Sequence, residues 1–159
     1  MPSEHRCSEQ RPSAQLVEQL REWARGLGFS QIGISGVDLH TAEPGLLAWL
    51  DAGFHGSMGY MAAHGLKRAR PAALRPGTVS VISARMDYLP RDAAPDWAER
   101  ELAAQAQAGQ AVVSVYARGR DYHKVLRQRL VRLTERLQAE VGPLGHRVFT
   151  DSAPVLEVE

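Results

Sequence analysis

A short stretch near the end of the chain, "DSAP", contains the side chain best suited to acid–base chemistry, Asp151. It follows the apolar pair "VF", so we expect it at the carboxyl end of a strand, where open α/β sheets commonly place ligand sites. Partial burial raises the pKa of a carboxyl group, which can then hold a proton near neutral pH and deliver it. The alternative is that Asp151 caps a following turn or helix with Pro154 early in it, and the residues alone favour that alternative.

A second group of polar side chains lies at 116–130, "YARGRDYHKVLRQRL", where a helix begins. From Tyr116 to Arg147 the chain has eight basic residues against three acidic ones, a local charge of +5. The whole chain carries +1, so the remainder carries −4. A basic segment on a mildly acidic protein suggests a polyanionic partner such as RNA. A solvated helix face is the simpler interpretation, and charge alone favours it.

Other functional motifs are few. His55 and His64 lie nine residues apart without metal-ligand spacing, and His123, in the first helical turn, is expected to be structural, so we predict no metal site. The one cysteine, Cys7, excludes an intrachain disulfide and a self-contained iron–sulfur cluster. The chain contains no P-loop, no dinucleotide-binding glycine fingerprint and no Gly-x-Ser-x-Gly elbow.

The elements that must position these side chains follow from hydrophobic periodicity and capping residues. Ser13 and Asp121 are predicted N-caps of helices, the second with an apolar stripe spaced by three and four from Tyr122 to Val141. Loop and broken helix are expected over 53–77. Further helices are expected at 43–52 and 97–107, and strands at 29–35, 78–90 with Val79 and Val81 buried, 111–117 and from 147 onward.

Length and composition indicate one globular domain. The 159 residues are 44% hydrophobic and 23% charged, with no apolar run long enough to span a membrane and no signal peptide, so we expect a cytoplasmic protein. We expect residues 1–12 to be a disordered leader and 13–159 to form the domain. The sequence ends on "VLEVE" in the middle of an apolar pattern, so a fragment of a longer protein is expected.

Several segments together resemble a known family. "LGFSQIGIS", "AEPGLLAWLDAGFHGSMGYMAAHGLKRARPAALRPGTVSVISARMDYLP", "YARGRDYHKVLRQRL" and "FTDSAPVLE" resemble the N-terminal half of bacterial epoxyqueuosine reductase. The resemblance implies reduction of epoxyqueuosine to queuosine in the tRNA anticodon, with cobalamin and two [4Fe–4S] clusters. The implied fold is α/β (α+β), a single nitroreductase-like cobalamin-binding domain with a small sheet flanked by helices. The C-terminal ferredoxin-like domain that holds the clusters would be absent, so we expect no turnover from this chain alone.

The resemblance also assigns residues. Asp151 matches the proposed proton donor, Arg68 and Ser114 match positions that contact cobalamin, and Tyr122 and His123 match the pocket wall. Some relatives carry cysteine where Ser114 stands, beneath the corrin ring. Serine is a poor cobalt ligand, so the cofactor is expected base-off and weakly ligated. Val115 stands where relatives carry arginine, so a contact to the cofactor or to tRNA is expected to be missing. Thr150 stands where valine is common, and this change is expected to alter the hydration of Asp151.

The expected partners are tRNA and an electron donor, and the expected state is a monomer without membrane contact. Two rival functions stay open. One is a non-catalytic tRNA- or RNA-binding module that uses the basic helix 122–141. The other is a stand-alone flavin enzyme of nitroreductase type.

Overall fold

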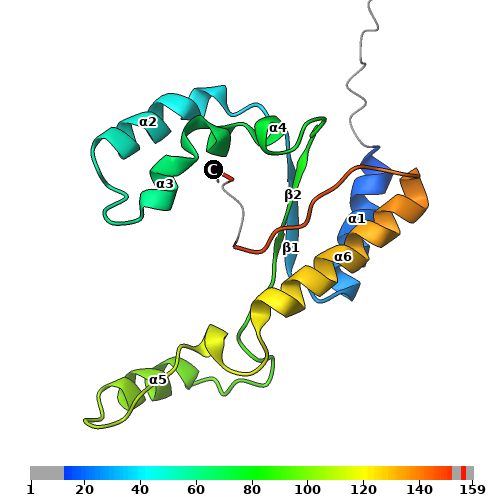
Figure 1. Cartoon of the computed structure of the whole chain (residues 1–159). Coiled ribbons are helices and arrows are strands. Elements are labelled where there is room, and N and C mark those ends of the chain that lie inside the picture. Colours follow the sequence, from blue (N-terminus) through cyan, green and yellow to red (C-terminus); the bar gives the residue numbers. More distant parts are fainter. Residues whose placement is uncertain (1–12, 152–154, 157–159) are drawn as a thin grey trace, which may run out of the picture.

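Two packed helices and a two-stranded sheet form the centre of the protein, seen in a computed structural model that describes residues 13–151 and 155–156. Strands β1 (Gln31–Ser35) and β2 (Val81–Arg85) pair antiparallel, with Gly33 opposite Ser83. Helices α1 (Ala14–Gly26) and α6 (Tyr122–Val141) lie side by side next to this sheet (Figure 1). The arrangement is α+β, as expected, with a small sheet flanked by helices.

The hydrophobic core forms where α1, β1 and α6 meet. It consists of five buried side chains contributed by these elements and the turn between α1 and β1: Leu20, Ala24, Phe29, Ile32 and Leu133. Leu126, Leu130 and Leu137 of α6 pack against the cluster. The three- and four-residue spacing that predicted this helix therefore marks its core-facing side as far as Leu137. Val141, the last residue of the predicted stripe, is 48% exposed, not part of the core.

Local contacts build both ends of α1. Ser13 accepts a hydrogen bond from the Leu16 N–H (3.2 Å), which confirms it as the α1 N-cap. At the other end, the Gly28 and Phe29 N–H groups donate to the carbonyls of Arg25 and Ala24. Gly28 has φ +86°, the left-handed conformation that this pair of bonds requires and that glycine adopts without steric cost. The chain therefore turns directly from α1 into β1.

Smaller helices form two arms, one at each end of the two-stranded sheet (Figure 1). One arm contains 3₁₀ helix η1 (His40–Ala42), α2 (Glu43–Asp51), α3 (Gly59–Ala63), 3₁₀ helix η2 (Gly65–Ala69) and α4 (Pro71–Leu74). The other contains α5 (Trp97–Gln105) and leads through 3₁₀ helix η3 (Val115–Ala117) into α6. Both arms extend away from α1 and α6, so the backbone outlines a crescent (Figure 1).

Two of the expected strands do not form, and some expected burial is wrong. Residues 111–114 and 142–150 have no strand structure, and 115–117 are the 3₁₀ helix η3. A strand needs a partner for its N–H and C=O groups, and in the described part of the chain β1 and β2 pair only with each other. Val79 precedes β2 and is 83% exposed, not buried. Leu47 of α2 is also exposed, although the apolar residues of this helix predict its burial.

Helices α2 and α5 agree with the expectations from the sequence. The stretch 53–77 also agrees, because it consists of short helices separated by turns. Residues 1–12 lie outside the described part of the chain, so the leader stays a prediction. None of the described helices combines the length and apolar character needed to cross a bilayer.

Candidate active site

Asp151 is held against the first turn of α6. Its Oδ2 atom accepts a 2.5 Å hydrogen bond from the Tyr122 hydroxyl and lies 3.3 Å from Nε2 of His123. No described residue bonds to Oδ1. One carboxyl oxygen is thus fixed by two side chains of α6.

The sequence "DYH" builds this arrangement because it starts the helix. The carboxylate of Asp121 accepts a 3.0 Å hydrogen bond from the His123 backbone N–H, which confirms Asp121 as the N-cap. The same Oδ1 lies 3.1 Å from Nδ1 of the His123 ring. The imidazole therefore bridges two carboxylates, Asp121 at one nitrogen and Asp151 at the other.

These contacts set the protonation of the site. The hydrogen bond to His123 lowers the pKa of Asp121 below its usual value. The hydrogen bond to Asp151 raises the pKa of Tyr122 to about 12, since ionised tyrosine could not donate it. At neutral pH, Tyr122 is therefore a phenol that donates to Asp151.

Aromatic rings extend the site away from Asp151. Tyr122 stacks on His123, with ring centroids 3.9 Å apart, and meets Tyr116 edge-on at 5.7 Å. Tyr116 in turn meets Tyr88 edge-on at 6.3 Å. Tyr88 and Tyr116 are 65% and 51% exposed, so the row presents apolar rings to solvent beside an acid.

The setting of Asp151 differs from the expectation. It does not follow a strand, and its side chain is 58% exposed rather than partly buried. Its backbone has φ +56°, a left-handed conformation that aspartate tolerates better than most residues. The alternative role as a cap involves Ser152–Pro154, which lie outside the described residues.

Arg68 and Ser114 do not join this cluster directly. Arg68 is 8% exposed, and its Nε and Nη2 donate to the carbonyls of Met61 (3.0 Å) and Tyr60 (3.1 Å). These bonds tie η2 to α3, and the Arg68 carbonyl accepts from the Leu156 N–H (2.9 Å). Ser114 is exposed at the start of η3, where its carbonyl accepts from the Ala117 N–H, and not in a strand.

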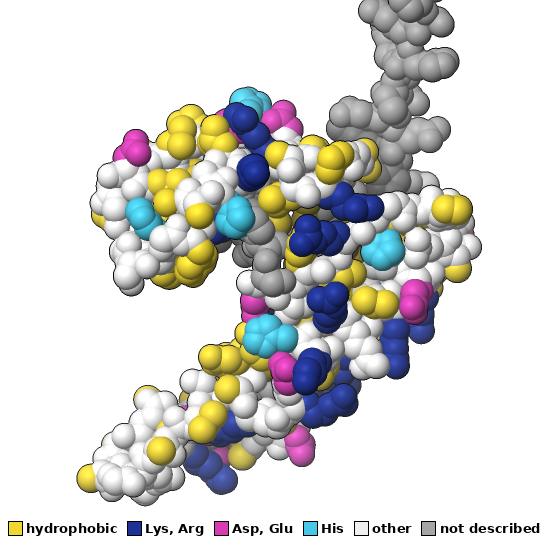
Figure 2. Space-filling view, viewed as in Figure 1, with side chains coloured by type: hydrophobic (Ala, Val, Ile, Leu, Met, Phe, Trp, Pro, Cys, Tyr) yellow, Lys and Arg dark blue, Asp and Glu magenta, His cyan; other side chains and the backbone are white. Residues whose placement is uncertain are grey.

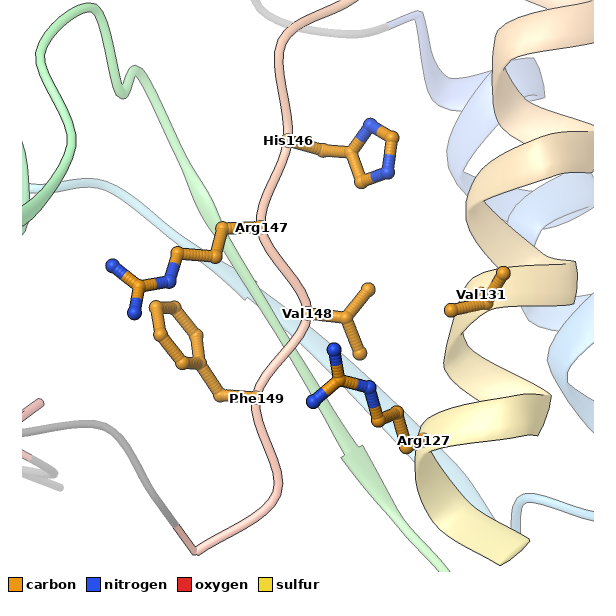
Figure 3. A pocket seen from close by; sticks show the side chains of 6 residues that line it. All are labelled: Arg127, Val131, His146, Arg147, Val148 and Phe149. Atoms are coloured by element: carbon orange, nitrogen blue, oxygen red, sulfur yellow. The ribbon is translucent and has the colours of Figure 1, made fainter. Parts of the chain in front are cut away.

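A small basic pocket lies between α6 and the segment that follows it. It has a volume of about 280 Å³ and is lined by two residues of α6 and four of the segment that follows: Arg127, Val131, His146, Arg147, Val148 and Phe149 (Figure 3). Figure 2 shows Lys and Arg side chains in a column across the middle of the molecule, beside the hollow between the two arms. The sequence showed the excess of basic residues but not which of them line a pocket.

Histidines elsewhere form no comparable site. Across residues 13–151 and 155–156, no three His, Cys, Asp or Glu side chains lie close enough to bind one metal ion. His55 stands next to the Trp49 ring, and His40 pairs with Asp38 at an exposed position.

Comparison with known proteins gives a consistent match. A family model described as "Epoxyqueuosine reductase QueG, DUF1730" matches residues 68–152. A protein of Alicycliphilus denitrificans named epoxyqueuosine reductase is 66% identical over 147 residues, which cover 92% of this chain and 41% of the relative. The proteins of that name from Burkholderia pseudomallei and Pseudomonas aeruginosa are 62% and 57% identical and are each covered over 38% of their length. No solved structure matches the chain.

Proposed function

Because the chain belongs to the epoxyqueuosine reductase family described as QueG, DUF1730, we propose that it forms the part of such an enzyme that holds the reacting base and its proton donor. The chain spans about two fifths of the length of the curated relatives it matches, so the activity is that of the longer enzyme. The proposed reaction reduces epoxyqueuosine in a tRNA anticodon to queuosine, with Asp151 as general acid.

The observation that carries this proposal is the clamp on Asp151. Tyr122 and His123 hold Oδ2, while Oδ1 has no partner within the described residues. A general acid must be fixed in direction and must present its proton to the leaving group. The clamp meets the first requirement and the open Oδ1 meets the second.

The chemistry defines what Asp151 must do. Converting an epoxide to an alkene breaks two carbon–oxygen bonds, forms one carbon–carbon π bond and releases water, so it consumes two electrons and two protons. Asp151 delivers a proton from Oδ1 to the oxygen as the first carbon–oxygen bond breaks. Asp151, whose side chain is 58% exposed, then takes a second proton at Oδ1 from solvent and delivers it as the oxygen leaves as water. Tyr122 and His123 hold Oδ2 in place, and Asp121 orients the His123 ring.

The described side chains fit a cobalamin only in part. When bound, cobalamin would supply the electrons for the reduction. Ser114 is exposed and precedes the aromatic row, so this segment can lie against a flat ring. Arg68 has already committed Nε and Nη2 to the backbone, which leaves Nη1 for an amide or phosphate oxygen of the cofactor.

The electron relay is proposed to lie in the portion of the relatives that this chain does not span. A [4Fe–4S] cluster takes four cysteine ligands, and this chain has one cysteine. We therefore assign the clusters and the contact with an electron donor to that portion, and we expect no turnover from the chain alone. The nitroreductase-like fold and the monomeric state belong to the same proposal.

Substitution of Asp151 in the full-length enzyme tests the acid role. Asp151→Asn keeps the shape of the side chain and its acceptor oxygen but removes the acidic proton. We expect product formation to fall by about 10²-fold or more while cobalamin stays bound, as judged by its absorption spectrum. Asp38→Asn is the matched control, because Asp38 is another exposed aspartate paired with a histidine. Activity of Asp151→Asn close to that of the control would remove the acid role.

A second candidate function has its own observation. The basic side chains of α6 could make the chain an RNA-binding module without catalysis. That function predicts tRNA binding with no effect of Asp151→Asn on any property of the full-length enzyme. The clamp on Asp151 favours the enzyme, since RNA binding alone gives no reason to orient an acid.

A further inference from the structure

The ion pair between Glu101 and Arg118 joins α5 to the chain that leads into α6. Arg118 donates from Nη1 and Nη2 to the two carboxylate oxygens of Glu101, at 2.7 Å and 2.5 Å. Its Nε donates to the Val113 carbonyl at 2.8 Å. One guanidinium therefore uses all three of its nitrogens, and it connects α5 to both ends of the segment 113–118.

The geometry of this pair sets it apart from an ordinary surface contact. An exposed ion pair commonly adds little stability, unless the contact is bidentate and its geometry well defined. Here both carboxylate oxygens are engaged, and the Glu101 side chain is only 23% exposed. The hydrogen bonds lower the pKa of Glu101 and raise the pKa of Arg118, so both groups are charged at neutral pH. The pair is therefore a fixed link between two elements.

The segment that Arg118 closes depends on this link. It contains the short helix η3, which is formed by two backbone hydrogen bonds over 114–118. Residues 106–114, between α5 and η3, form neither helix nor strand. Within the described part of the chain, neither α5 nor η3 has a buried side chain. Core packing therefore does not hold η3 in place, and the side-chain contacts of Arg118 do.

Tyr116 lies in the middle of η3 and leads to the acid. Its ring meets the Tyr122 ring edge-on, with centroids 5.7 Å apart. The hydroxyl of Tyr122 in turn donates to Oδ2 of Asp151. In Figure 1 the short yellow turn of η3 lies between α5 and the first turn of α6. A continuous path of contacts and backbone thus runs from Glu101 on α5 to the proposed proton donor.

We propose that Glu101 and Arg118 are positioning residues for the active site. Their contact holds η3 so that Tyr116 stays against Tyr122, which fixes the carboxyl group of Asp151. This inference rests on the proposed function, because the reaction that Asp151 serves comes from it. Neither Glu101 nor Arg118 contacts the reacting base in this role, so the pair acts on the rate of proton transfer and not on the binding of tRNA.

Two substitutions break the link, and each has a matched control on α5. Glu101→Gln and Arg118→Gln remove one partner each. The controls are Asp96→Asn and Arg100→Gln, because Asp96 and Arg100 form a 2.8 Å ion pair that does not involve η3. Melting temperatures of all four variants verify folding. Glu101→Gln leaves the bond from Arg118 to Val113 in place, so it tests the link if Arg118→Gln is unfolded.

The first measurement follows the tyrosine rings of this chain by NMR, because the signals of one ring depend on the placement of the ring next to it. The chain has four tyrosines, so Tyr→Phe substitutions assign each signal. We expect the signals of Tyr116 and Tyr122 to move in Glu101→Gln and Arg118→Gln and to stay in both controls. The signals of Tyr60, in α3 on the other arm, should stay in every variant. Unmoved signals of Tyr116 and Tyr122 in the first two variants would overturn the positioning role.

The second measurement is the steady-state rate of the full-length enzyme on tRNA that carries epoxyqueuosine. We expect kcat to fall about tenfold in Glu101→Gln and Arg118→Gln, because a misplaced acid slows the chemical step. KM for the tRNA should stay close to that of the unaltered enzyme, since the pair binds no substrate. Both controls should retain kcat. Equal losses in the controls would show a general effect of charge on α5 and overturn the inference.

Asp151→Asn, measured beside these variants, separates this inference from the proposed function. If Asp151→Asn is inactive while Glu101→Gln and Arg118→Gln keep full kcat, the acid role stands and the positioning role falls. If Asp151→Asn keeps full activity, the proposed function falls, and the positioning role falls with it. A higher KM with unchanged kcat in the Glu101 and Arg118 variants would assign the pair to tRNA binding and would also overturn the proposal.

Discussion

The hydroxyl group of Tyr122 donates a 2.5 Å hydrogen bond to Oδ2 of Asp151, across 29 residues of sequence. This contact joins the first turn of the longest helix to the segment that carries the proposed acid. It also explains the raised pKa of Tyr122, because the phenol must keep its proton to donate.

Removal of the Asp151 carboxylate should return the pKa of Tyr122 toward its usual value. The folded pKa of Tyr122 is about 12, above the usual 10.0, so the stability that this contact adds is present below pH 10 and is lost as the pH rises through about 12. We expect Asp151→Ala to shift one tyrosine of the four to a lower pKa in an ultraviolet absorbance titration. Tyr122→Phe lacks the Tyr122 hydroxyl, so the titration step that is missing in this variant belongs to Tyr122. An unchanged titration in Asp151→Ala would contradict the contact.

Loss of the α6 cap should destabilise the protein in a pH-dependent way. The contact between Asp121 and His123 lowers the pKa of Asp121. The stability that this contact adds is therefore present above the unfolded pKa of Asp121 and is lost as the pH falls through its folded pKa. Asp121→Ala should lower the melting temperature at neutral pH, and the difference should shrink in acid. Asp121→Asn is the control, since asparagine is also a good N-cap. It should recover most of the neutral-pH loss.

Two glycines at the end of α1 should respond in opposite directions to alanine. Gly28 has φ +86°, and an added Cβ would lie 2.5 Å from Nη1 of Arg129, so we expect Gly28→Ala to cost more than about 1 kcal/mol in unfolding free energy. Gly26 is helical with nothing within 4 Å of an added Cβ, so Gly26→Ala should be neutral or stabilise by up to about 1 kcal/mol. Denaturant unfolding measures both. Equal effects would argue against the observed turn.

Cobalamin binding by the chain itself can be measured without turnover. We expect addition of the chain to change the absorption spectrum of cob(II)alamin and the cofactor to co-elute on gel filtration. Ser114→Cys should alter the bound spectrum further if position 114 faces cobalt, because a thiolate is a better ligand for the metal than a hydroxyl. Identical spectra with and without the chain would count against cofactor binding by this part of the enzyme.

The first turn of α6 shows how far local patterns reach. Asp121 was predicted as a cap because its side chain needs only the N–H of a residue two positions away. Tyr122 was predicted as part of the core stripe from the spacing of apolar residues alone. Its hydroxyl contact with Asp151 involves a segment far along the chain, and no local spacing encodes that contact.

The incorrect strand predictions have the same origin. Residues 111–117 and 147–149 are apolar enough to form strands, but a strand exists only where another chain segment offers matching N–H and C=O groups. In the described part of the chain, β1 and β2 pair only with each other, so these segments join no sheet. Asp151 therefore does not follow a strand, and its side chain is exposed.

The sequence by itself determined the features that depend on near neighbours: the Ser13 and Asp121 caps, the core stripe of α6 as far as Leu137 and the excess of basic residues after Tyr116. Tertiary structure alone decided which distant groups meet. It committed two N–H groups of Arg68 to the backbone of α3, placed residues 146–149 beside α6 around one pocket and closed the clamp on Asp151. Hydrogen bonds within one helical turn are fixed by the chain's own geometry, whereas these contacts require the whole chain to fold first.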